Sequence, residues 1–172
     1  ERVAAWAREH GAIMVADAAQ AAPHRKVDVQ AIGCDFLAIS AHKMCGPSGV
    51  GALYGRYAAL ERVAPFLVGG DTVRDVWADR VEFKQPPGRF EAGLQDYAGI
   101  LGAAAAIEYV TRRVGLDAIA AHEADLLEYG AGVLQSIPGL RLVGTAREKA
   151  GVLSFVLDGI HLLRGAFVRM DD

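Results

Sequence analysis

Short apolar runs alternate with helical patterns along the first third of the chain. An amphipathic segment at 1–10 predicts a helix that ends at Gly11, since glycine favours the position after a helix. Apolar runs at 12–16, 35–40 and 49–55 predict three strands. These strands show little polar alternation, which is typical of strands buried on both faces. The pattern therefore predicts an α/β layer with a largely parallel sheet.

The rest of the chain is predicted to contain further helices, one long irregular segment and two more strands. A loop and a short helix ending near Gly33 connect the first two strands, and another short helix follows at 57–64. Residues 65–95 are predicted to be irregular, and a loop of this length is usually functional. The last predicted elements are helices at 97–115 and 116–137 and two strands, expected to be adjacent, at 140–144 and 151–159.

Composition narrows the class of protein. The chain has 172 residues, of which 52% are hydrophobic, so it can bury a core. Its net charge of −3 argues against nucleic acid as a partner, and its longest apolar stretch is too short and too rich in alanine to span a bilayer. Two cysteines, Cys34 and Cys45, are too few for a disulfide framework. We expect a portion of a soluble, cytoplasmic protein that binds neither nucleic acid nor membrane.

The segment "SAHKMCGPSGVG" at 40–51 contains the most suggestive residue, Lys43. This lysine lies between two predicted core strands and precedes a glycine-rich turn. A lysine held in a partly desolvated pocket becomes a usable amine nucleophile. The commonest use of such a lysine is a Schiff base, with a carbonyl substrate or with pyridoxal phosphate.

Pyridoxal phosphate makes further demands that nearby residues can meet. Its ring nitrogen needs a carboxylate, and Asp17 closes a strand where ligands bind in open α/β sheets. Gln20 can donate to the phenolic oxygen of the ring, and Ala19 is small enough to lie under it. Ser40 and His42 flank the lysine and can reach the phosphate. The glycines after the lysine allow a sharp turn close to the cofactor.

Each residue also has a structural interpretation. A strand-ending aspartate such as Asp17 is often a cap, and a single histidine such as His42 is more often structural. The "GPSG" turn is not a phosphate-binding P-loop, because no lysine follows it. The joint spacing of the aspartate–glutamine pair and the serine–histidine–lysine run favours a cofactor site.

Two segments, 15–55 and 89–110, resemble the class V aminotransferase group of fold-type I pyridoxal-phosphate enzymes. The closest resemblance is to Suf-type cysteine desulfurases and selenocysteine lyases, and it extends to about Gly159. It implies an aspartate-aminotransferase-like α/β fold in a homodimer. Residues 1–109 would form part of the large cofactor-binding domain, and 110–172 would begin the small α+β C-terminal domain.

The resemblance also implies a role for each site residue. Lys43 would hold the cofactor as an internal aldimine and later move the α-proton of the substrate. Asp17 would pair with the pyridinium nitrogen, and Gln20 would contact the phenolic oxygen. Ser40 and His42 would contact the phosphate.

The chain departs from the family pattern at several points. Residues 89–93 would lie near the dimer interface and complete the phosphate site of the neighbouring subunit, but Leu94 replaces the usual threonine and cannot donate to a phosphate. The substrate-carboxylate arginine and the nucleophilic cysteine should come from a downstream segment, and neither Arg164 nor Arg169 is assigned to that role. Cys34 is expected in the core, and Cys45 is not expected to be the nucleophile.

Three functional hypotheses follow. The first is a pyridoxal-phosphate-dependent cysteine desulfurase, which converts L-cysteine to L-alanine and passes the sulfur to an enzyme cysteine absent from this chain, with selenocysteine as the other candidate substrate. A sulfur-acceptor protein and iron–sulfur cluster assembly would then be its context. The second is another pyridoxal-phosphate enzyme of the same family. The third is a non-catalytic remnant, and the isolated chain is expected to have little or no desulfurase activity.

Overall fold

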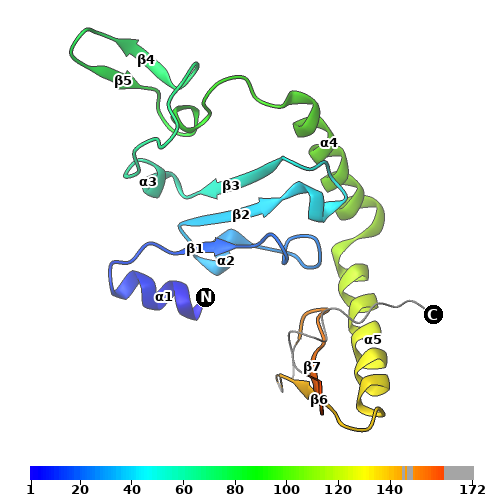
Figure 1. The fold of residues 1–172 in the computed structure, drawn as a ribbon. Helices are drawn as coiled ribbons and strands as arrows, with labels where there is room; N and C mark the ends of the chain where they lie inside the picture. Colours follow the sequence, from blue (N-terminus) through cyan, green and yellow to red (C-terminus); the bar gives the residue numbers. More distant parts are fainter. Residues whose placement is uncertain (145, 147–148, 161–172) are drawn as a thin grey trace. The chain divides into compact units, whose positions relative to one another are not determined.

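A computed structural model describes residues 1–144, 146 and 149–160, which fall into two compact units, one of Glu1–Leu116 and one of the described residues from Asp117 onward. The first unit contains a three-stranded sheet, a separate β-hairpin and several helices (Figure 1). The second contains most of one long helix and another β-hairpin. The mixed α/β content agrees with the predicted fold class. The division into large and small domains after residue 109 stays a prediction.

The main sheet has the order β1-β2-β3, with β1 at Val15–Asp17, β2 at Phe36–Ser40 and β3 at Gly51–Gly55. β1 is parallel to β2, and β3 is antiparallel to β2. The prediction of a largely parallel sheet is therefore wrong for this part of the chain. Residues 41–50, which join β2 to β3, are fewer than the dozen or more that a parallel crossover needs.

Burial differs between the strands. β2 begins with two buried residues, whereas β1 and β3 are exposed along most of their length, so the expected burial on both faces is wrong for β1 and β3. The core cluster centres on Ala18, Cys34 and Leu37. Cys34 is only 3% exposed, which confirms its expected place in the core.

Two helices flank the parallel pair of strands. α1 spans Arg2–Glu9, and α2 spans Val29–Ile32. The Asp28 side chain caps α2 by accepting hydrogen bonds from the backbone N–H groups of residues 30 and 31, at 2.8 and 3.1 Å. Gly33 ends α2 in the left-handed conformation, with φ of 73°. Both helices were expected from the sequence.

The region predicted to be irregular contains a β-hairpin formed by β4 (Val73–Val76) and β5 (Val81–Phe83), so that prediction is wrong in part. The base of the hairpin is fixed by Thr72, whose buried hydroxyl donates to the carbonyl oxygen of Gly69 at 2.7 Å. An ion pair between Lys84 and Asp71 lies at the same end of the hairpin. The hairpin follows α3 (Tyr57–Leu60) and precedes the short 3₁₀ helix η2 (Gly88–Phe90).

The helical half of the chain largely matches its prediction. α4 spans Tyr97–Glu108 and continues as a π-helical segment, η3, over Tyr109–Val114. α5 spans Leu116–Gln135, and β6 (Leu140–Val143) pairs antiparallel with β7 (Ser154–Leu157), as expected. Within the described ranges, no helix is both long and apolar enough to cross a bilayer.

Candidate functional site

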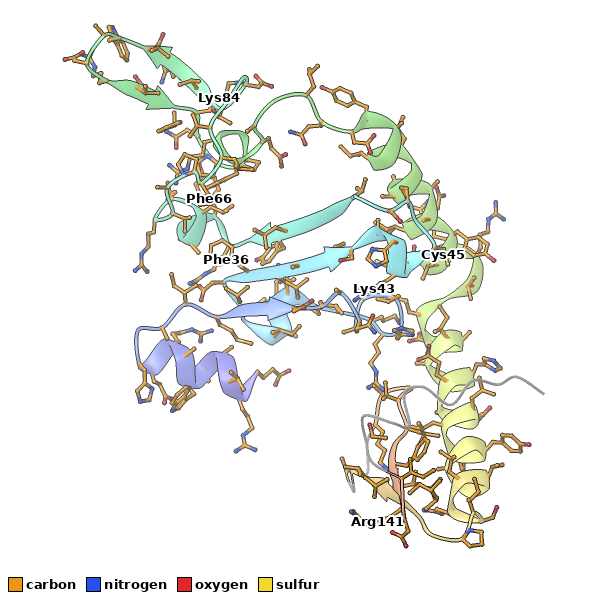
Figure 2. The ribbon with its side chains drawn as sticks, viewed as in Figure 1. Phe36, Lys43, Cys45, Phe66, Lys84 and Arg141 are labelled. Carbon is orange, nitrogen blue, oxygen red and sulfur yellow. The ribbon has the colours of Figure 1, made fainter. Side chains whose placement is uncertain are left out.

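The carboxyl ends of the parallel strands bring the predicted site residues to one edge of the sheet. Asp17 is the last residue of β1, and it lies opposite Ala38 of β2. The pairing continues past β1, since the backbone N–H of Ala18 donates to the carbonyl oxygen of Ala38 at 2.9 Å. Ser40 ends β2. Lys43 lies just beyond it in the 3₁₀ helix η1 (Ala41–Met44), as Figure 2 shows.

The η1 turn determines which side chains face outward. A 3₁₀ helix has three residues per turn, so Ala41 and Met44 lie on the same face. Both are buried, while His42 and Lys43 between them are exposed. The partly desolvated lysine pocket expected from the sequence is therefore not formed by the residues that the structure describes. The turn instead leaves the imidazole and the amine accessible at the sheet edge.

The turn after Lys43 is tightly closed, as its glycines predicted. Cys45 is in the left-handed conformation, with φ of 60°. The N–H of Gly46 donates to the carbonyl oxygen of Ala41 at 2.9 Å, and the N–H of Ala41 donates to the carbonyl oxygen of Val50 at 3.0 Å. A Cβ at Gly46 would lie 2.8 Å from the carbonyl oxygen of Ala41. Glycine is therefore required at position 46 in this conformation.

Helix α4 packs against the same loop through small residues. A Cβ at Gly99 would lie 2.4 Å from Cγ2 of Val50, and one at Gly102 would lie 3.3 Å from Cγ of Pro47. Asp96 caps the helix by accepting a hydrogen bond from the N–H of Gly99 at 2.9 Å. The sequence analysis missed this contact. The spacing of three residues between the glycines, which places them on one helical face, was the available signal.

The carboxylate of Asp17 has one oxygen bonded within the turn after β1 and one that is available to a ligand. Its Oδ1 accepts a hydrogen bond from the backbone N–H of Ala19 at 2.9 Å, which fixes the carboxylate at the end of β1. No hydrogen bond to its Oδ2 is found among the described residues, so that oxygen can accept one from a ligand. Ala19 is half-buried, and Gln20 is exposed in the turn that follows. The donors and acceptors at this edge fit the chemistry of pyridoxal phosphate.

Arg89 has a structural role that the sequence analysis did not identify. Its Nη2 donates to the carbonyl oxygens of Leu60, the last residue of α3, and of Val63 beyond it, the latter at 2.8 Å. Nearby, the N–H of Gly93 donates to the carbonyl oxygen of Gly70 at 2.8 Å. Leu94 follows directly and is 93% exposed. Arg89 therefore anchors the segment that presents Leu94 to solvent.

Asp35 has a lowered pKa but lies at the opposite end of β2. Its Oδ2 accepts a hydrogen bond from the backbone N–H of Met14 at 2.9 Å, and its Oδ1 forms an ion pair with Arg56. The amide of Met14, followed by the guanidinium of Arg56, lowers the pKa of this carboxyl. Asp35 thus ties the start of β2 to the segments before β1 and after β3.

Within the described parts of the chain, no group of three or more His, Cys, Asp or Glu side chains could hold a metal ion. Arg164 and Arg169, considered for the substrate carboxylate, lie outside the described residues.

The chain is similar to known proteins over most of its length. The model of the family "Aminotransferase class-V" matches residues 1–167. A probable cysteine desulfurase from Xylella fastidiosa (strain Temecula1) is 48% identical over 155 residues, which cover 90% of this chain and 37% of that protein.

Solved structures show the same likeness. The apo structure of the cysteine desulfurase from Thermococcus onnurineus NA1 matches with a TM-score of 0.85 and 38% identity, over 95% of this chain and 41% of that one. A variant of the protein C-DES, with glycine covalently linked to its PLP cofactor, shares the fold at 24% identity. Its TM-score is 0.69, over 81% of this chain and 37% of that one. The chain thus spans about two fifths of the length of these relatives.

Proposed function

Because this chain belongs to the class-V aminotransferase family, we propose that the whole protein is a pyridoxal-phosphate-dependent cysteine desulfurase. The observation that carries the proposal is the meeting of Asp17 with Ser40, His42 and Lys43 at the carboxyl edge of β1 and β2. The names of the relatives that match the chain at 41–48% identity support the same activity.

The described residues can hold the cofactor through complementary groups. Lys43 would bind it covalently through Nζ, and the carboxylate of Asp17 would accept a hydrogen bond from the protonated ring nitrogen. Ser40 and His42 would donate to the phosphate. Gln20 would contact the phenolic oxygen.

When bound, pyridoxal phosphate supplies an electron sink for the electrons left on the substrate when its α-proton departs. The main task of this chain is then to move and place protons. Lys43 Nζ would take the α-proton of cysteine, and it is accessible to do so because η1 turns it outward. Asp17 would keep the ring nitrogen protonated, because a carboxylate within hydrogen-bonding distance favours the charged form. Half-buried Ala19 would leave room for the ring.

The overall reaction would convert L-cysteine to L-alanine and transfer the sulfur to a cysteine thiolate of the enzyme. We assign that role to neither cysteine of this chain. Cys34 is buried in the core cluster, out of reach of a substrate. Cys45 lies in the tight turn just after Lys43, in a left-handed conformation fixed by the turn. The thiolate would come from a part of the protein outside this chain.

The protein would act as a cytoplasmic homodimer that passes sulfur to an acceptor protein for iron–sulfur cluster assembly. Two free cysteines are compatible with a reducing compartment. Phe66 and Leu94, at 97% and 93% exposure, are unusually exposed apolar side chains, which favours a protein interface around them. The family resemblance supports the same dimeric assembly.

Covalent trapping tests the proposal directly. We expect that pyridoxal phosphate followed by borohydride leaves a stable adduct on the peptide that contains Lys43, detected by mass spectrometry. The Lys43→Ala variant should lose the adduct and the visible absorbance of the lysine-linked cofactor. Lys84→Ala is the matched control, because Lys84 pairs with Asp71 in the hairpin rather than at the sheet edge. Equal labelling of both variants and the unmodified protein would refute the cofactor assignment.

A further inference from the structure

A pocket lies at the end of the main sheet opposite to the Lys43 turn. Its lining includes Arg8 from the last turn of α1, Asp35 before β2, Arg56 after β3, and Arg62 beyond α3. Asp35 precedes β2 and Lys43 follows it, and a five-residue strand spans roughly 16 Å. The pocket is therefore separate from the proposed cofactor edge.

The pocket carries an excess of positive charge. Three guanidinium groups and one carboxylate line it, which leaves two uncompensated positive charges. Both oxygens of Asp35 are already engaged, Oδ2 by the amide of Met14 and Oδ1 by Arg56. Within the described part of the chain, neither Arg8 nor Arg62 forms an ion pair. Arg8 acts on Asp35 only through a longer-range charge interaction, so the three guanidinium groups outweigh the one carboxylate and create a local field that favours an anion.

The position of Arg8 is built into the fold. Gly33, in the left-handed conformation with φ of 73°, forms part of the pocket wall. A Cβ there would lie 3.1 Å from Nη2 of Arg8, so the missing side chain leaves space that the guanidinium occupies. The pocket volume is about 180 Å³. This is many times the roughly 10–15 Å³ that one water molecule needs, so a phosphate can enter.

We propose that this pocket binds a small oxyanion, inorganic phosphate or a phosphate monoester, between Arg8 and Arg62. The guanidinium fork presents paired N–H donors that match two oxygens of a phosphate. Arg56 also lines the pocket and adds positive charge while it is paired with Asp35. The site lies apart from the cofactor phosphate and does not depend on the proposed desulfurase activity.

Calorimetric titration with inorganic phosphate at constant ionic strength tests the site. The protein is first loaded with pyridoxal phosphate, so that phosphate-binding groups at the Lys43 edge are occupied, and unbound cofactor, itself a phosphate monoester, is removed before the titration. We expect binding about fivefold weaker in Arg62→Gln, as for loss of one exposed charge contact, and at least tenfold weaker in the Arg8→Gln/Arg62→Gln double variant. Arg2→Gln, on the same helix as Arg8 but outside the pocket lining, should bind like the unmodified protein.

Each outcome bears on the proposal. Arg62 is exposed and its side chain makes no hydrogen bond or ion pair within the described residues, so Arg62→Gln should fold normally and decides the test even if the double variant unfolds. Arg62→Lys keeps the charge but loses the paired donors, so its affinity should lie between those of the unmodified protein and Arg62→Gln. No heat beyond that of a chloride titration, or equal binding by Arg62→Gln and Arg2→Gln, would overturn the assignment. Because the arginine variants leave the Lys43 edge intact, failure here is distinguishable from failure to bind the cofactor.

Discussion

Replacing Gly46 with alanine should disturb the turn that positions Lys43. The added Cβ would lie 2.8 Å from the carbonyl oxygen of Ala41 and 3.0 Å from its Cβ. The first distance is about 0.5 Å shorter than the closest usual carbon–oxygen contact of about 3.3 Å. The obstacle is backbone rather than a flexible side chain, so η1 or the following loop has to move.

The expected change in the free energy of unfolding combines two destabilising effects with one stabilising effect. Overpacking of this kind costs about 1–3 kcal/mol, and the same carbonyl accepts the N–H of Gly46, a hydrogen bond worth about 1 kcal/mol. Alanine lowers the conformational entropy of the unfolded chain, which stabilises the folded state by about 0.4–1 kcal/mol. We therefore expect Gly46→Ala to lower the free energy of unfolding by about 1–3 kcal/mol.

Tryptophan fluorescence during urea unfolding provides the assay, because Trp6 and Trp77, the two tryptophans, both belong to the first compact unit. Gly132→Ala, in α5 with no atom near the added Cβ, is the control. It should leave the tryptophan transition unchanged or stabilise the helix by up to about 1 kcal/mol.

Cofactor trapping on Lys43 provides the second measurement. Because Gly46 closes the turn that contains the lysine, we expect Gly46→Ala to lower the yield of the borohydride-trapped adduct, whereas Gly132→Ala should not. A Gly46→Ala protein as stable as the unmodified one and with the same adduct yield would show that the turn does not position the amine.

Three other predictions concern charges and packing. The lowered pKa of Asp35 means that it stabilises the fold above the unfolded-state pKa of about 3.9, and this contribution is lost as the pH falls through the folded-state pKa. Asp35→Asn should therefore flatten the decline in the free energy of unfolding below about pH 4, and an unchanged pH profile would contradict this. Asp28→Ala should cost about 1 kcal/mol in urea unfolding, because two backbone N–H groups of α2 lose their cap, and Asp79→Ala in the hairpin should cost little. Gly99→Ala should also destabilise the first unit, by about 1–3 kcal/mol, since its Cβ would lie 2.4 Å from Val50, and equal urea midpoints would refute the close packing.

Local sequence signals predicted most elements near the proposed site. The apolar runs located β1, β2 and β3, and Gly33 correctly marked the end of α2. The strand-ending position of Asp17 and the position of Lys43 after β2 could also be read from the sequence. Their meeting at one edge required only that β1 and β2 be parallel, which the helical segment between them favoured.

Other features depended on contacts that no local pattern encodes. The β4–β5 hairpin was missed because its strands are short and mostly exposed, so they lack an apolar run. The roles of Arg89 and Asp35 depend on backbone groups 21 to 29 residues away. The family resemblance suggested a place for the Arg89 segment but not the carbonyl oxygens that anchor it.

The sequence by itself determined which residues are proposed for the site, because residue type and spacing around Asp17 and Lys43 are properties of the chain. Tertiary structure decided the antiparallel return of β3, the outward orientation of Lys43, and the grouping of Arg8, Arg56 and Arg62 in one pocket. The reason is physical. Propensity and periodicity act over a few neighbouring residues, whereas strand direction and pocket charge arise from segments that meet only when the chain folds.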